Sequence, residues 1–293
     1  MIEHTHVLGQ PAMRLRASDG AEATVLLHGA HVVSWIPAGD QERLYLSPLA
    51  QAGAGQSVRG GIPVIFPQFA DQVLPMRDGQ PGAATHPPSA LPRHGLARNR
   101  AWQWVEGAKR AGAMIGVLRL CSDEATRALW PHDFEAELTL SFSGLELDVE
   151  LAITNTGHST FDFTAALHTY LLCDDVRRAR LGGLYDVRYL DSLSGHEQRQ
   201  EMDPFSFAGE IDRIYFDVEA PLSLATAMGR MAIHSEGFDD VVVWNPGPLK
   251  AAALTDMPDD DWLRMLCVEA ACIGRPVALA PGQDWAARQS FIA

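Results

Sequence analysis

The sequence predicts an all-β fold, a large antiparallel β-sandwich with a few short helices. Polar and apolar residues alternate in Phe134–Phe142 and again in Leu145–Ile153. Two alternating runs joined by Ser143-Gly144 are typical of a β-hairpin with one solvated face. Other short apolar runs follow at the spacing of sandwich strands, separated by turn residues. No window keeps a helical period for long.

The other elements are predicted from the same signals. Ala23–Leu27 and His31–Ile36 flank His28-Gly29-Ala30 and predict a second hairpin. Further strands are expected where short apolar runs end at turn residues: Met114–Leu120, Phe161–His168, Tyr185–Tyr189, Met231–His234, Val241–Trp244 and Leu266–Ala271. Short helices are expected at Asp123–Leu129 and Asp259–Met265.

The chain shows no linker and no internal repeat, so we expect residues 1–293 to form a single β-sandwich domain. The oligomeric state is open, with a monomer favoured. The loop from Gln68 to Arg93 is rich in Pro, Gly and Ala. Loops of this length are usually functional or mobile.

Composition excludes several classes of protein. The net charge of −14 argues against nucleic acid and anionic membranes as partners. No apolar run could span a bilayer, and the N-terminus lacks a secretory signal, so we expect a cytoplasmic protein. The four cysteines match no zinc spacing and are expected to be free thiols, with no metal site. Phosphate-loop, dinucleotide and GxSxG motifs are absent.

Basic residues gather in one window of this acidic chain. Between Gln56 and Arg110, seven basic residues stand against three acidic ones, a net charge of +4. Within the window, Arg59 precedes Gly60-Gly61, which lets the backbone approach a ligand closely. An arginine binds carboxylate or phosphate bidentately. The window indicates either a small anionic ligand or scattered loop arginines, with Arg59 in a structural salt bridge.

Two apolar runs are each interrupted by one titratable residue. Glu269 lies inside Leu266–Cys272, and His168 ends Phe163–His168. A carboxylate in apolar surroundings has a raised pKa that suits proton transfer near neutrality. If both side chains faced one cleft, they would form an acid–base pair. Otherwise Glu269 points to water at a sheet edge. His94, beside Gly95, is a further candidate or a structural histidine.

Five motifs in order resemble one family. RGGIPVIFPQF, RHGLARNRAW, ALHTY, VVVWNPGP and MLCVEAACI begin at Arg59, Arg93, Ala166, Val241 and Met265. Together they resemble the hexose-6-phosphate mutarotases (glucose-6-phosphate 1-epimerases) of the aldose 1-epimerase, or galactose-mutarotase-like, superfamily. The resemblance runs from about Ala23 to the C-terminus. It implies a galactose-mutarotase-like β-sandwich, no cofactor, and interconversion of the α and β anomers of a phosphorylated aldohexose.

The resemblance also implies roles for particular residues. Glu269 matches the general base that takes the anomeric proton, and His168 matches the general acid that protonates the ring oxygen. His94 and Gln68 are expected to line the sugar site. By the same resemblance, Arg59 and Arg98 are expected near the phosphate, and Asp191 is expected to hydrogen-bond the sugar hydroxyls.

The chain departs from the family pattern at several positions. Arg93, Leu96, Ala70 and Leu171 replace the more usual Gln, Phe, Gly and Phe, and the Gln72–Pro92 loop is longer than usual. These changes leave the acid and base untouched and put substrate preference in doubt. Two alternatives stay open: a non-catalytic sugar-phosphate-binding protein on the same fold, and a glycosidase that pairs Glu269 with Asp191.

Overall fold

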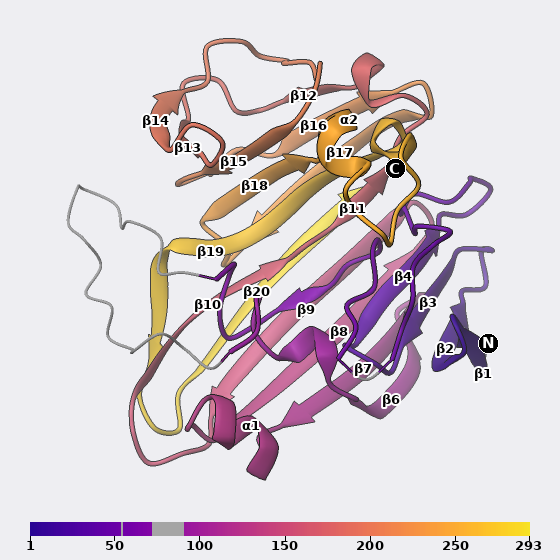
Figure 1. Ribbon diagram of the computed structural model, residues 1–293. Helices are drawn as coiled ribbons and strands as arrows, with labels where there is room; N and C mark the ends of the chain where they lie inside the picture. The colour runs from indigo at the N-terminus through magenta and orange to yellow at the C-terminus, as the bar shows by residue number, and fades with distance from the viewer. Residues whose placement is uncertain (54, 72–90) are drawn as a thin grey trace.

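The computed structural model describes residues 1–53, 55–71 and 91–293 (Figure 1). The predicted all-β class is confirmed, because antiparallel strands make up most of these residues. The α-helices within them are short, α1 at Glu124–Leu129 and α2 at Gly247–Ala251. None of the helices in the described ranges is long and apolar enough to cross a membrane.

One eight-stranded sheet, which we call the site sheet, contains the run with Glu269. Its long central strand is β19, which pairs with neighbours on both sides. The order is β14 (His196–Arg199), β13 (Arg188–Asp191), β15 (Ile211–Tyr215), β18 (Asp240–Asn245), β19 (Met265–Leu279), β10 (Phe161–Leu167) and β5 (Val64–Ile65), with β11 (Tyr170–Leu172) also paired to β19.

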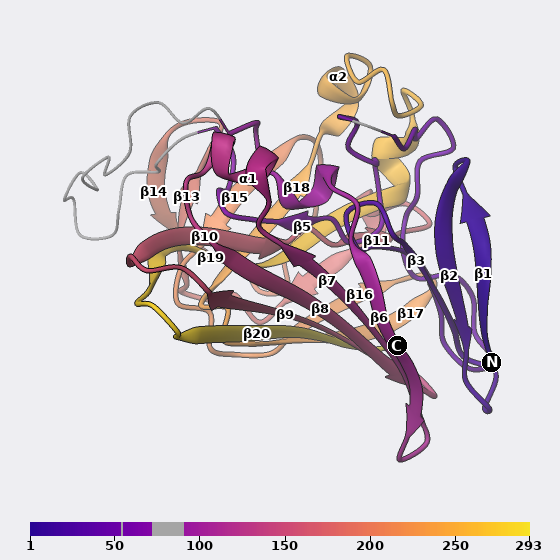
Figure 2. The ribbon, with the colours of Figure 1, turned by 90° about the horizontal axis from the view of Figure 1, so that it is seen from below.

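A second eight-stranded sheet, the outer sheet, packs against the site sheet (Figure 2). Its strands β8 and β9 alternate between buried and partly exposed residues, as the sequence predicted. The order is β12 (Arg180–Gly182), β16 (Leu222–Thr226), β17 (Gly229–Glu236), β20 (Asp284–Ile292), β9 (Glu146–Asn155), β8 (Phe134–Ser143), β7 (Ala113–Cys121) and β6 (Gln103–Arg110).

A four-stranded N-terminal sheet stands at one end of these layers (Figure 2). It consists of β1 (Ile2–Val7), β2 (Gln10–Arg16), β3 (Glu22–Leu26) and β4 (His31–Ile36), and the β3–β4 pair is the predicted second hairpin. The main core lies between the two large sheets. Phe66 is central to it, with edge-to-face contacts to Phe134 of the outer sheet and Phe163 of the site sheet.

Three predicted elements differ from the structure. The strand expected at Tyr185–Tyr189 begins only at Arg188, because Asp186 has a φ of 60° that extended backbone does not allow. The helix expected at Asp259–Met265 is a single 3-10 turn, Asp261–Arg264, without a side-chain cap. The strand at Leu266–Ala271 is longer than predicted, since β19 continues past Cys272 to pair again with β10.

The helix expected at Asp123–Leu129 is confirmed. Asp123 accepts a hydrogen bond from the backbone of Thr126, whose hydroxyl accepts one from the backbone of Asp123, a reciprocal capping box. The Gln72–Pro92 loop lies outside the described residues except for its last two positions. The single-domain organisation over 1–293 stays a prediction.

Candidate active site

Glu269 lies in the middle of the site sheet, on the face turned away from the main core. Ten consecutive residues from Met265 are buried, so β19 is covered on both faces in this stretch. A small apolar cluster covers the second face, with Val242 and Ala271 among its members. Because strand neighbours alternate between faces, Cys267, Glu269 and Ala271 share this second face, which we call the site face.

Strand register brings His168 to Glu269. Leu167 of β10 lies opposite Ala270, and Tyr170 of β11 lies opposite Cys267. His168 therefore falls opposite Glu269, and its Nδ1 is 3.3 Å from Oε1 of the carboxyl group. The two predicted acid–base residues thus meet directly, although their runs are about a hundred positions apart in the chain.

The pair is almost fully withdrawn from water, with Glu269 1% and His168 9% exposed. Burial raises the pKa of Glu269 well above its usual value, with a further contribution from the negative charge of Asp212, while Arg98 lowers it. Burial and the nearby His94 and Arg98 hold the pKa of His168 well below its usual value. The free site therefore favours an uncharged pair.

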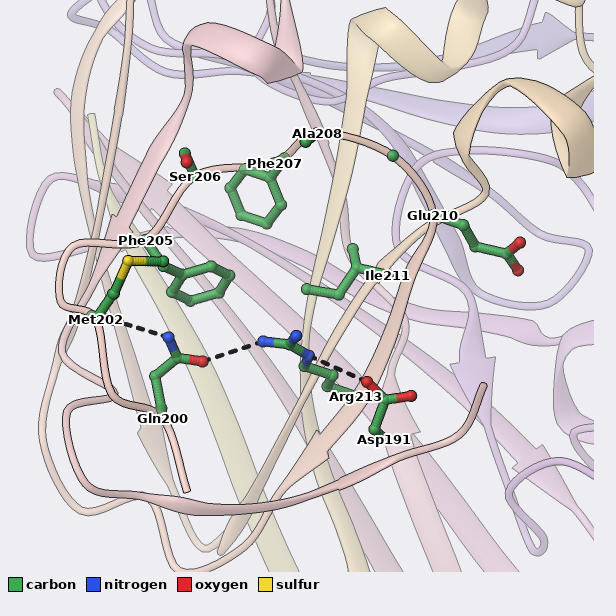
Figure 3. Close-up of a pocket in the computed structure, with 11 residues that line it drawn as sticks. Asp191, Gln200, Met202, Phe205, Ser206, Phe207, Ala208, Glu210, Ile211 and Arg213 are labelled. Atoms are coloured by element: carbon green, nitrogen blue, oxygen red, sulfur yellow. Dashed lines mark hydrogen bonds and ion pairs between the residues drawn. The ribbon is translucent and has the colours of Figure 1, made fainter. Parts of the chain in front are cut away.

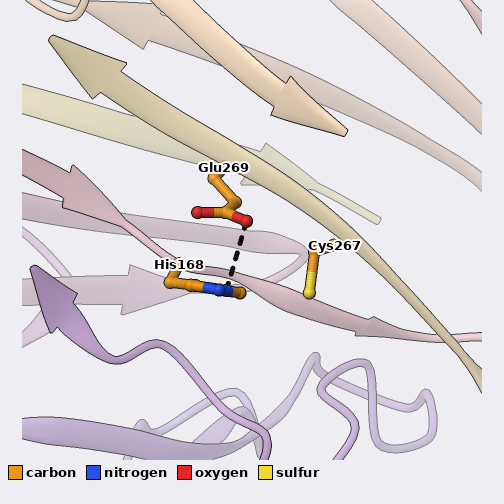
Figure 4. A group of neighbouring side chains, drawn as sticks. All are labelled: His168, Cys267 and Glu269. Atoms are coloured by element: carbon orange, nitrogen blue, oxygen red, sulfur yellow. Dashed lines mark ion pairs between the residues drawn. The ribbon is translucent and has the colours of Figure 1, made fainter. Parts of the chain in front are cut away.

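Aromatic rings and a thiol enclose this pair. The His168 ring stacks on Tyr170 with 4.9 Å between centroids, and Trp244 of β18 lies edge-on to it. Cys267 projects beside Glu269 from the same strand (Figure 4). The walls exclude water and fix the orientation of the imidazole.

Arg59 reaches the same face from the loop before β5. Its guanidinium forms an ion pair with Asp256 at 3.2 Å and donates to the Tyr170 hydroxyl at 3.1 Å. It also lies over the Trp244 ring, 6.0 Å from the centroid. Arg59 therefore forms a structural salt bridge and also lies on the site face. Asp256 orients its guanidinium beside Tyr170.

His94 lines the site through an unusual backbone. It has a φ of 65°, and the following Gly95 is required because a Cβ there would lie 2.2 Å from the carbonyl oxygen of Phe66. The backbone N–H of Ala70 donates to Nδ1 of His94 at 3.2 Å. A neutral His94 then carries its proton on Nε2, and its ring meets the His168 ring edge-on at 5.6 Å.

Arg98 follows His94 and carries little compensation for its charge. Its Nη2 donates to the backbone oxygen of Arg93 at 2.7 Å, and its Nε is buried without a hydrogen-bond partner. None of the ion pairs among the described residues includes Arg98. Burial, Arg59 and Arg93 lower the pKa of Arg98 to about 10. Gln68, also predicted for the site, donates to the carbonyl oxygen of Ala70, next to His94.

Asp191 is the predicted site residue that the structure does not bring to this group. It lies opposite Arg213 in the register of β13 and β15, so it occupies the opposite face from Asp212. Its carboxyl group is 3.6 Å from Arg213 (Figure 3). The same group accepts hydrogen bonds from the backbone N–H groups of Leu193 and Ser194. These contacts are those of a turn-forming aspartate on the face opposite the site face.

A second carboxyl group on the site face belongs to Asp212, which the sequence analysis missed. Its register partner is Trp244, which is itself opposite Cys267. Burial raises its pKa, and a hydrogen bond with Ser192 lowers it. The available signal was the short run around Asp212-Arg213, where two polar residues interrupt an apolar segment. Asp212, Trp244 and Tyr170 complete the group around the pair.

Comparisons with known proteins agree with this architecture. A solved structure titled "putative mutarotase" from Salmonella typhimurium superposes with a TM-score of 0.86 at 28% identity, covering 99% of this chain and 92% of that one. A galactose mutarotase-like protein from Clostridium acetobutylicum superposes with a TM-score of 0.71 at 13% identity, covering 99% and 97% of the two chains, which shows the shared fold. The fold is that of galactose mutarotase-like proteins.

The family model for aldose 1-epimerase matches residues 11–291, so the chain belongs to the aldose 1-epimerase family. A protein named "Putative glucose-6-phosphate 1-epimerase" in Cenchrus ciliaris is 33% identical over 288 residues, 94% of this chain and 82% of its own length. A protein of the same name in Escherichia coli is 33% identical over 256 residues, 85% and 79% of the two chains. The chain is therefore an isomerase of the epimerase type, a mutarotase.

Proposed function

We propose that this mutarotase interconverts the α and β anomers of a hexose 6-phosphate, with glucose 6-phosphate as the leading substrate. The observation that carries the phosphate is Arg98. It is a partly buried guanidinium whose Nε is buried without a hydrogen-bond partner, and it has no ion-pair partner among the described residues. Burial and two neighbouring arginines lower its pKa to about 10. An anionic group would compensate this charge, and arginine suits phosphate geometry.

The chemistry of ring opening fits the His168–Glu269 pair. Glu269 takes the proton from the anomeric hydroxyl, the bond between C1 and the ring oxygen breaks, and His168 protonates the ring oxygen. C1 then rotates about its bond to C2, and the ring closes on the other face with the transfers reversed. The two sugar oxygens are bonded to the same carbon, so the acid and base must be neighbours, and these atoms are 3.3 Å apart.

Burial assists the opening step. Ring opening starts from Glu269 as the carboxylate and His168 as the imidazolium. The two proton transfers leave both residues uncharged, which are the states that burial favours. Arg98 opposes this by lowering the pKa of Glu269, so the carboxylate form remains accessible before reaction. We assign Asp212 and His94 to the sugar hydroxyls, since both border the pair from separate segments.

The phosphate assignment is tested by exchange NMR of the two anomers. Arg98→Met keeps an apolar stem and removes the charge, and should lower kcat/KM for glucose 6-phosphate about 10–150-fold, the value of 1.5–3 kcal/mol for a charged hydrogen bond. Free glucose should lose far less. Arg119→Met, which breaks ion pairs on the outer sheet, is the control and should affect neither sugar. Equal losses for both sugars in Arg98→Met would reject the phosphate contact.

A further inference from the structure

Three metal-binding side chains meet on the site face: His168, Cys267 and Glu269 (Figure 4). One donor atom from each lies within 4.8 Å of the others, and all three residues are buried. Imidazole nitrogen, thiolate sulfur and carboxylate oxygen are the ligands of zinc in proteins. The spacing of the cysteines does not indicate this cluster, because His168 comes from a different part of the chain.

The spacing fits a tetrahedral ion. Two donors that each lie about 2.0–2.1 Å from a tetrahedral zinc ion are about 3.3–3.4 Å apart. Nδ1 of His168 and Oε1 of Glu269 are 3.3 Å apart. Zinc–sulfur bonds are longer, about 2.3 Å, which places sulfur about 3.5–3.6 Å from the other donors. Cys267, within 4.8 Å of them, therefore has to approach by at most about 1.3 Å.

The polar atoms of this cluster also lack other partners. Nδ1 of His168 and Oε2 of Glu269 are buried without hydrogen bonds in the part of the chain that the structure describes. Buried polar atoms are normally satisfied, and an ion held by Nδ1 and the carboxyl group would give Nδ1 a partner. When Cys267 binds as thiolate, its proton passes to solvent. A dication held by one thiolate and one carboxylate is neutral overall, which removes the cost of burying its charge.

We propose that His168, Cys267 and Glu269 form a three-ligand site for Zn²⁺ or a similar thiophilic divalent cation, and that the bound ion blocks ring opening. The thiolate selects Zn²⁺ or Co²⁺ over Mg²⁺ and Ca²⁺, which prefer oxygen ligands. Inhibition follows because the ion occupies the atoms that exchange protons with the sugar. The binding itself does not depend on which sugar is the substrate.

Co²⁺ titration of the chelator-treated protein tests the site without an activity measurement. We expect one equivalent to bind with a sulfur-to-cobalt charge-transfer band, and Zn²⁺ to displace it. Cys267→Ser should abolish the band. It should also lower Zn²⁺ affinity at least about tenfold, because loss of a residue that only supports a ligand already lowers metal affinity by about 10–100-fold. The matched control is Cys272→Ser on the same strand, where the thiol faces Ala165 and the band should remain.

Two further measurements keep the test decisive. Circular dichroism of each variant shows that its fold is retained, and Glu269→Gln probes the site without altering the thiol. It should keep the band and weaken Zn²⁺ binding. The proposal is overturned by a wild-type protein without the band, by a band that survives in Cys267→Ser, or by unchanged Zn²⁺ affinity in Glu269→Gln. Inhibition by Zn²⁺ should weaken in Cys267→Ser relative to its own metal-free rate.

Discussion

Replacing Glu269 by glutamine separates the chemical role of this carboxyl group from its role in packing. The amide has the same shape, so the buried position stays filled, but it cannot accept the anomeric proton. General base catalysis contributes about 10²–10⁴-fold, which corresponds to about 2.7–5.4 kcal/mol of transition-state free energy. We expect kcat for anomer exchange to fall by this factor.

Although Glu269→Gln should lower kcat, the structure predicts that it does not lower the free energy of unfolding. Glu269 is 1% exposed, and its Oε2 has no hydrogen-bond partner among the described residues. Burying such a group costs free energy, so Glu269→Gln should unfold at the same or a higher urea concentration than the wild type. Exchange NMR of glucose 6-phosphate gives the rate, and urea unfolding followed by circular dichroism gives the stability.

Glu42 provides the matched control, because it is a half-buried glutamate with a structural role. Its carboxyl oxygens accept from the backbone N–H groups of Trp35, Arg43 and Leu44 and from the Ser34 hydroxyl. Glu42→Gln loses acceptors for these donors and should destabilise the fold by about 1.5–3 kcal/mol with kcat unchanged. The reasoning is refuted if Glu269→Gln keeps its kcat within about threefold, well below the loss of a general base.

Three further outcomes follow from single contacts. Asp212→Asn should lower kcat/KM by about tenfold or more through loss of a charged hydrogen bond, while Asp191→Asn should leave it unchanged; the reverse pattern in exchange NMR would restore Asp191 to the sugar site. Gly95→Ala should destabilise the fold by more than about 1 kcal/mol in urea unfolding, since it combines a positive φ with a 2.2 Å contact. Phe66→Ala should cost about 3–5 kcal/mol, and a loss under 1 kcal/mol would contradict its central place in the core.

The hairpins were predictable because their signal is local. Alternation in β8 and β9 directly reports one buried and one wetter face, and the turn between them is encoded in two residues. The strand predicted at Tyr185–Tyr189 begins only at Arg188, because a local signal does not report the conformation of a turn. The left-handed backbone of Asp186 depends on the surrounding turn, which a short apolar run does not reveal.

Asp191 and Asp212 show where sequence reasoning about the site stops. A shift of one position moves a strand residue to the other face of the sheet, so assigning a carboxylate to the site requires the register of its strand. The motif resemblance pointed to Asp191, whereas the pairing of β15 with β18 brings Asp212 to the face of Trp244. The sequence could not show whether His168 and Glu269 face each other. The register between β10, β11 and β19 places them opposite one another.

The site divides into a part held by the sheet and a part held by loops. Glu269 and Cys267 lie on β19, with ladders on both sides, so their positions are fixed by backbone pairing. Arg59 lies in a loop and Arg98 in the short 3-10 helix Ala97–Asn99, both outside the ladders. Asp256 orients Arg59, and the backbone oxygen of Arg93 orients Arg98. Loops tolerate change far better than paired strands. The fold therefore constrains the position of the proposed acid–base pair, whereas the proposed phosphate contacts can vary. We expect substitutions at Arg59 and Arg98 to cost less stability than substitutions on β19.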